Sequence, residues 1–88
     1  MADPLPIPSA ASDDPNALEL IRVWTTGTNQ VFAINALVLS DPANWGSVLV
    51  DLAVNVAGAF ENNNDMSAEE AFVLIKKGFV AEWENPTQ

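Results

Sequence analysis

The chain has 88 residues, 49% of them apolar, with 3 basic against 12 acidic residues and a net charge of −9. This composition indicates a globular protein, and three basic residues disfavour binding to nucleic acid or to an anionic membrane. Because the chain has neither Cys nor His, disulfides are excluded and no metal site is expected.

The small size of the chain has a consequence for its stability. A chain this short buries only about 60–65% of its unfolded surface and usually needs a disulfide, a structural metal or a partner. Here a well-packed core or oligomerisation remains. We expect no cofactor and no secretory leader. No apolar run approaches the length of a membrane helix, and we expect a cytoplasmic protein.

Residues 1–16 read as an acidic tail that contains four of the six prolines. Proline removes backbone donors and small or acidic residues bury little, so we expect disorder. The alternative is that the tail docks on a partner through Leu5 and Ile7.

Two short segments favour a β-hairpin. Residues 18–26 and 30–38 are rich in β-branched and aromatic residues, as strands are, with apolar side chains on both faces. The segment Gly27-Thr28-Asn29 between them is a turn signal, because Gly and Asn tolerate positive φ. The short separation predicts an antiparallel pair.

Two helices are predicted after the hairpin. Asp41 and Pro42 are typical of an N-cap and a first helical position, and the apolar residues that follow have helical spacing as far as Phe60. After a polar linker at residues 62–65, Ser67 with Glu70 has the spacing of a capping box. The inner face of the second helix is predicted to comprise Phe72, Ile75, Phe79 and Trp83, and Asn85-Pro86 ends that helix.

These elements predict a single α+β domain over residues 17–86, with an antiparallel hairpin followed by two helices (ββαα). A lone hairpin with two unpaired edges is marginal in water, and the first helix carries more apolar surface than one sheet and one helix would cover. We therefore expect a homodimer, formed through hairpin edges or through the helices. The alternative is a compact monomer in which the tail covers the hairpin.

The sequence does not predict an enzyme. Without His or Cys it lacks the usual general base near neutral pH and the thiol nucleophile. Its four glycines are isolated, so no phosphate-binding loop is present, and no Ser lies in a Gly-x-Ser-x-Gly setting. Most acidic residues fall at solvated or capping positions, so we expect no catalytic residue.

Five residues are the candidates for a ligand site or an interface: Arg22, Trp24, Trp45, Asp51 and Asn55. Arg22 is expected to pair with a carboxylate such as Asp51; it could instead stack on Trp24 or bind an anionic ligand. Asp51 and Asn55 share a helical face, either as a solvated strip or as the wall of a polar pocket or interface. The tryptophans are expected in the core; exposed on one face, they would mark an interface.

Two segments of the chain carry a resemblance. Residues 19–24 contain Arg-Val-Trp, and residues 41–46 contain Asp-Pro-x-x-Trp-Gly, followed by Asp51 on the first helix. This pattern resembles a family of short bacterial proteins known only as a domain of unknown function. The resemblance covers residues 18–60 and implies a bacterial cytoplasmic protein with no assigned activity.

Two functions follow as hypotheses. The first is a non-enzymatic, self-associating protein that acts through protein–protein contacts, including contacts with a second protein. The second is a domain that binds a small anionic ligand at Arg22, Trp24, Asp51 and Asn55.

Overall fold

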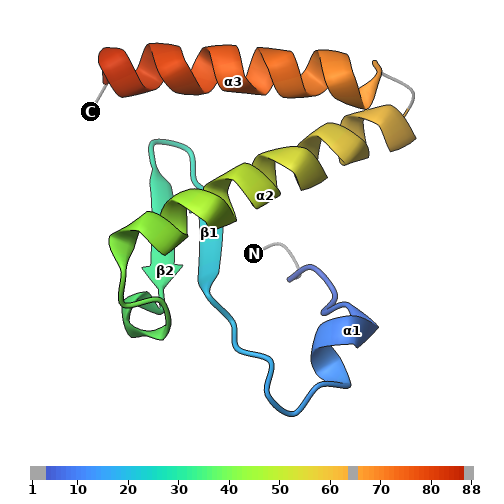
Figure 1. Ribbon diagram of the computed structural model, residues 1–88, viewed down its shortest axis with the longest axis vertical. Coiled ribbons are helices and arrows are strands. Elements are labelled where there is room, and N and C mark those ends of the chain that lie inside the picture. The colour runs from blue at the N-terminus through green and yellow to red at the C-terminus, as the bar shows by residue number, and fades with distance from the viewer. Residues whose placement is uncertain (1–3, 64–65, 87–88) are drawn as a thin grey trace. The chain divides into compact units, whose positions relative to one another are not determined.

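The computed structural model describes residues 4–63 and 66–86 (Figure 1). Its elements follow the order α1 (Ser9–Ser12), β1 (Ile21–Thr25), β2 (Gln30–Ile34), η1 (Ala36–Val38), α2 (Pro42–Asn62) and α3 (Ala68–Glu84). They fall into two compact units, Met1–Ser40 and Asp41–Gln88. The α+β fold predicted from the sequence, a hairpin followed by two long helices, is confirmed. Whether residues 17–86 behave as a single domain stays a prediction.

The described part of the tail contains one short helical turn that the sequence did not predict. In this turn, α1, the backbone N–H groups of Ala11 and Ser12 donate to the carbonyl oxygen of Pro8 at 2.9 and 3.0 Å. Residues 4–16 are exposed apart from the half-buried Ala11. The expected disorder of the tail stays a prediction, and its first three positions lie outside the described residues.

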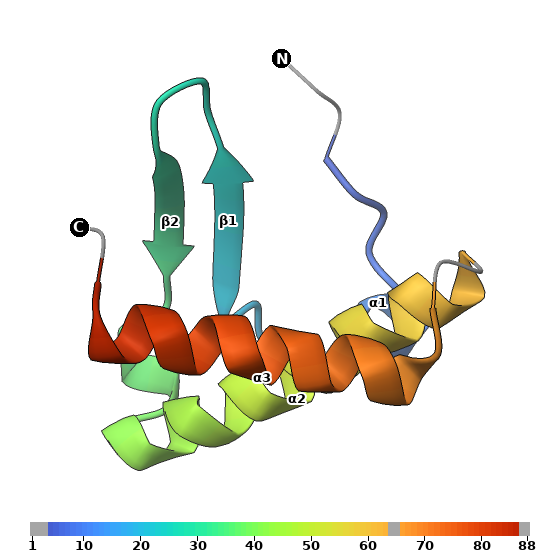
Figure 2. The same cartoon turned by 90° about the horizontal axis from the view of Figure 1, so that it is seen from above.

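The strands β1 and β2 form an antiparallel hairpin (Figure 2). Their register places apolar residues on both faces. On one face Ile21 pairs with Ile34 and Val23 with Phe32, while Trp24 lies opposite Val31 on the other. Such cross-strand pairs each contribute about 0.2–1 kcal/mol. Every residue of the two strands except Ile21 is nonetheless exposed. The hairpin therefore has no covered face within its own unit.

Both strands are shorter than the sequence predicted. Asn35 ends β2 because its backbone leaves the extended region, and η1 then begins at Ala36. The Asn35 N–H still donates to the carbonyl of Leu20 at 2.9 Å, so the pairing continues just beyond Ile21. Residues 18–20 are otherwise outside the strand pairing, because the chain after Asn35 forms η1 instead of continuing β2.

The turn between the strands is closed by a hydroxyl group rather than by a left-handed glycine. The Thr26 Oγ1 accepts the N–H of Thr28 at 3.3 Å and the N–H of Asn29 at 3.0 Å. The Thr26 N–H donates to the carbonyl oxygen of Asn29 at 2.7 Å. Gly27 does not adopt a positive φ. The turn lies where it was predicted, but Gly27 does not supply a left-handed residue to it.

The start of α2 matches the prediction. Asp41 has extended backbone angles, its Oδ1 accepts the N–H of Ala43 at 3.0 Å, and Pro42 is the first helical residue. A side chain in this position satisfies one of the free N–H groups of the first turn. The helix ends at Asn62, where the polar linker was predicted; positions 64 and 65 of that linker lie outside the described residues.

Replacing Asp41 with Ala should lower the free energy of unfolding by about 1 kcal/mol, because the first turn of α2 loses its cap. Asp51→Ala is the matched control, since Asp51 is exposed on the same helix and far from either end. Urea denaturation of both variants measures the difference. Equal losses of stability in the two variants would contradict the capping role.

The start of α3 is capped from two sides. The Glu70 N–H donates to Ser67 Oγ at 3.2 Å, and that hydroxyl donates to Glu70 Oε1 at 3.1 Å. The sequence predicted that the Glu70 side chain would bind the backbone N–H of Ser67; it binds the hydroxyl instead. A second cap comes from α2, where Glu61 Oε2 accepts the N–H of Ala68 at 3.1 Å. The end of one helix thus stabilises the beginning of the next.

The helices α2 and α3 converge at their connection and diverge from it, so that the pair forms a V (Figure 1). The only buried residues in the described part of the chain are Ala57 and Ala71, each 2% exposed, one on each helix. Small side chains allow two helices to approach closely. No large apolar side chain among the described residues is fully buried. No described helix is both long enough and apolar enough to span a bilayer.

Candidate functional site

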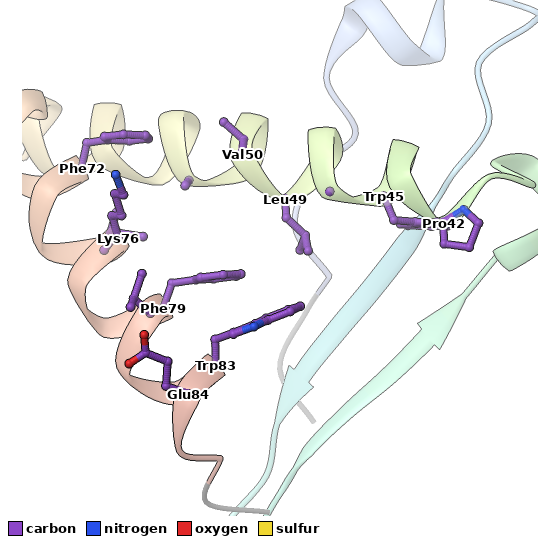
Figure 3. Close-up of a pocket in the computed structure, with 13 residues that line it drawn as sticks. Pro42, Trp45, Leu49, Val50, Phe72, Lys76, Phe79, Trp83 and Glu84 are labelled. Atoms are coloured by element: carbon purple, nitrogen blue, oxygen red, sulfur yellow. The ribbon is translucent and has the colours of Figure 1, made fainter.

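An apolar groove lies between the two arms of the V. It has a volume of about 840 Å³ and is built entirely from α2 and α3 (Figure 3). The labelled side chains Leu49 of α2 and Phe79 and Trp83 of α3 point into the gap. The residues that line the groove are Pro42, Trp45, Gly46, Leu49, Val50, Ala53, Phe72, Ile75, Lys76, Phe79, Val80, Trp83 and Glu84. We refer to this feature as the α2–α3 groove.

The wall of the α2–α3 groove is large, aromatic and open to solvent. The rings of Phe79 and Trp83 stack one turn apart on α3, with centroids 5.8 Å apart and planes inclined by 17°. Trp83 is nevertheless 74% exposed. Stacked aromatic side chains normally lie in a core or an interface, because each buries a large apolar area. The α2–α3 groove therefore has the composition of a core without the covering layer.

Two charged residues of opposite sign, Lys76 and Glu84, complete the lining of the groove. Both lie on α3 and both are exposed. The helix pattern that predicted an inner face at Phe72, Ile75, Phe79 and Trp83 identified the apolar wall correctly. It did not indicate that this face would remain open, or that Lys76 and Glu84 would lie along it.

The hairpin carries a second, shallower hollow of about 530 Å³. Its lining contains Arg22, Glu19, Asn35, three apolar residues of the two strands, and Leu20 just before β1. The Arg22 Nε–H donates to Glu19 Oε2 at 2.7 Å, which forms an ion pair. This hydrogen bond, and then the charge of Glu19, raise the pKa of Arg22 further above its ordinary value. Arg22 therefore stays protonated across the physiological range.

Arg22 and Trp24 were both predicted as site residues. They lie two positions apart on β1, so they share a face of the hairpin, and both are exposed. The carboxylate that pairs with Arg22 is Glu19, a residue three positions away that the sequence analysis did not name. Because both side chains of this pair are more than half exposed, the ion pair contributes little to stability.

Asp51 and Asn55 lie one turn apart in the middle of α2, and both are exposed. The Asn55 Nδ2 donates to the backbone carbonyl of Asp51 at 2.8 Å, so the amide does not bind the Asp51 carboxylate. Neither residue lines the α2–α3 groove. This geometry is that of a solvated helical strip.

Trp45 is the one predicted site residue that lies in the α2–α3 groove. It is half-buried near the start of α2, next to Pro42 in the lining (Figure 3). The structure thus combines Trp45 with Phe79 and Trp83 along the groove. The pocket predicted from Arg22, Trp24, Asp51 and Asn55 draws on two separate units, the first two residues from the hairpin and the others from α2. Among the described residues, no cluster of acidic side chains is able to hold a metal ion.

Comparison with known proteins places the whole described chain within one family. Residues 4–87 match the family described as Domain of unknown function (DUF5076). A solved structure of a "putative pyruvate dehydrogenase" from the photosynthetic bacterium Rhodopseudomonas palustrus CGA009 is similar, with 28% identity and a TM-score of 0.72. The match covers 100% of this chain and 92% of that one, so the two share their fold over nearly their full lengths. No curated protein matches.

Proposed function

This chain belongs to the DUF5076 family, and from that premise we propose that it is a non-enzymatic, self-associating protein that acts through protein–protein contacts. One observation carries the proposal. Nearly half of the residues are apolar, yet only two alanines are buried among the residues that the structure describes. The side chains that would normally build a core lie on the surface of each unit.

The exposed apolar surface provides the free energy that would drive association. Burying a fully exposed Val, Leu or Phe side chain stabilises by about 1.5–3 kcal/mol, so a half-exposed one still contributes about 1 kcal/mol. Residues of this kind occur on the hairpin and along both arms of the V. Soluble monomers rarely leave contiguous apolar patches of this kind uncovered, and larger ones mark interaction sites. Association with another chain removes these surfaces from water.

Enzymatic activity is not part of the proposal. The α2–α3 groove has an apolar wall whose charged members are one lysine and one glutamate, and the chain has no His or Cys. An acid–base site would need titratable groups held together in a desolvated setting. For this reason we do not propose a pyruvate dehydrogenase activity for this chain.

Binding of a small anionic ligand at Arg22 is the second candidate. The open hollow beside Arg22 on the hairpin favours it. The neighbouring Glu19 opposes it, because its carboxylate already occupies Arg22 Nε and repels a second anion. Self-association therefore has the stronger support. We also propose a cytoplasmic location, in line with the absence of Cys.

At about 0.15 M salt and micromolar concentration, multi-angle light scattering should give twice the chain mass of 9.4 kDa. Each copy carries a net charge of −9, so two copies repel one another. The Debye length falls from about 30 Å at 0.01 M to about 8 Å at 0.15 M salt, so added salt screens this repulsion. The dimer should therefore tighten as salt rises over that range.

A species of 9.4 kDa at every salt and protein concentration would overturn self-association. A dimer that loosens steadily with salt would indicate that ion pairs, rather than apolar contacts, hold it together. The salt titration thus separates the two kinds of contact in one experiment.

A further inference from the structure

We infer that the α2–α3 groove is occupied by a second copy of this chain, with α3 packing antiparallel against α3 of that copy about Val80. The inference rests on the proposed self-association and deepens it by naming the contact surface. A two-fold dimer uses the same patch on both copies, so the patch must be complementary to itself. The arrangement of charge along α3 meets this condition.

The charges in question are Lys76 and Glu84. They are eight residues apart on one helix, which corresponds to about 12 Å along its axis, and both line the groove. Neither forms an ion pair with any residue that the structure describes. Each is therefore free to pair with a charge from outside the chain.

The midpoint between these two charges is Val80, which also lines the groove. When a second α3 runs antiparallel and crosses at Val80, Lys76 of each copy lies opposite Glu84 of the other. Two identical ion pairs then form, one on each side of the symmetry axis. A parallel arrangement in register would instead place Lys76 against Lys76 and Glu84 against Glu84. The charges thus select both a second copy and its direction.

The apolar wall supports the same occupant. The groove extends along α3 from Phe72 to Glu84, so it accommodates several turns of a helix rather than a compact molecule. Amphipathic helices bind in such grooves through apolar residues at helical spacing. The face of α3 formed by Phe79, Val80 and Trp83 has this spacing. A second copy brings a face of this kind together with the matching charges.

Among the glycines of the two helices, Gly46 is the one that lines the groove. A glycine inside a helix lowers stability by about 1 kcal/mol relative to alanine. Apart from its two neighbours and the backbone of its own helix, no described residue lies within 4 Å of where a Cβ would stand at Gly46, and the same holds for Gly58 and Gly78. Gly46 lines the groove, and the close approach of another backbone is a setting that favours this residue.

Charge reversal tests the inference, with sedimentation velocity on the full chain as the measurement. Lys76→Glu and Glu84→Lys should each weaken the dimer about tenfold, because each places like charges together at both symmetric positions. The double variant, K76E with E84K, should restore the wild-type dissociation constant to within about threefold. Lys77→Glu is the control, since it changes net charge as Lys76→Glu does but lies outside the groove lining.

The Glu84→Lys variant separates local pairing from net charge. It lowers the net negative charge, so general repulsion alone predicts a tighter dimer, whereas loss of the pair predicts a weaker one. A wild-type dimer that responds equally to Lys76→Glu and Lys77→Glu, or a double variant no better than the single ones, would overturn this seam and leave self-association standing. A wild-type chain that is monomeric overturns the proposed function itself.

Discussion

Val50→Asp should convert the dimer into a monomer at micromolar concentration, whereas Val54→Asp should leave the dimer intact. Val50 lines the α2–α3 groove and Val54 does not, although both are on α2 and are 56% and 54% exposed. An unpaired charge buried in an interface costs about 3–5 kcal/mol, which corresponds to at least a 100-fold weaker complex. Because the proposed dimer is two-fold symmetric, the interface would contain this charge twice, once from each copy.

The pair is closely matched because both substitutions have the same helix propensity cost and the same change in net charge. Circular dichroism at equal concentrations checks that α2 is retained in each variant. Sedimentation velocity then gives the dissociation constants. Equal weakening by the two substitutions would contradict a contact in the groove, and dissociation by Val54→Asp alone would move the contact along α2 to a turn outside the groove lining.

Ala57→Leu should lower the free energy of unfolding by about 1–3 kcal/mol, because it forces a larger side chain into the vertex of the V. Ala57 is 2% exposed and is one of the two buried residues that join α2 to α3. Ala59→Leu is the matched control, since Ala59 is exposed on the same helix and Leu and Ala have similar helix propensities. The control should stay within about 0.5 kcal/mol of the wild type.

Urea denaturation of both variants at several protein concentrations measures these effects and separates the vertex from the dimer. A loss at the vertex is independent of concentration, whereas a loss of association diminishes as concentration rises. If Ala57→Leu were as stable as Ala59→Leu, the close approach of the helices at this point would not contribute to the fold.

The termini of the helices were the most predictable part of the fold. Asp41 and Ser67 accept backbone N–H groups within a few residues of themselves, and Pro42 has no N–H that needs a partner, so the local sequence contains the whole interaction. The cap supplied by Glu61 to Ala68 was not predicted, since it depends on the direction in which α3 leaves α2. The end of β2 depends on the backbone conformation of Asn35. The residues that favour strands continue to residue 38, so the sequence predicted a longer strand.

The candidate site was predictable only in part. Helical spacing identified the apolar face that contains Phe79 and Trp83, but spacing says which residues share a face and not what covers them. Arg22 and Asp51 were predicted as site residues because each is a charged residue among apolar neighbours in the sequence. Apolar neighbours in the sequence do not imply an apolar environment in the folded chain. Both side chains are exposed, and Arg22 is paired with the carboxylate of Glu19. Of the five predicted site residues, only Trp45 lines the groove.

We expect the vertex of the V to act as a pivot between α2 and α3. The buried residues of the two helices, Ala57 and Ala71, have small side chains, while the large side chains of the groove lie along the diverging arms. Because these buried side chains are small, we expect them to limit how closely the arms approach but to constrain the angle between the arms only weakly. The width of the groove is then set by the object that fills it. In the proposed dimer, the angle between α2 and α3 in each copy would therefore depend on the other copy.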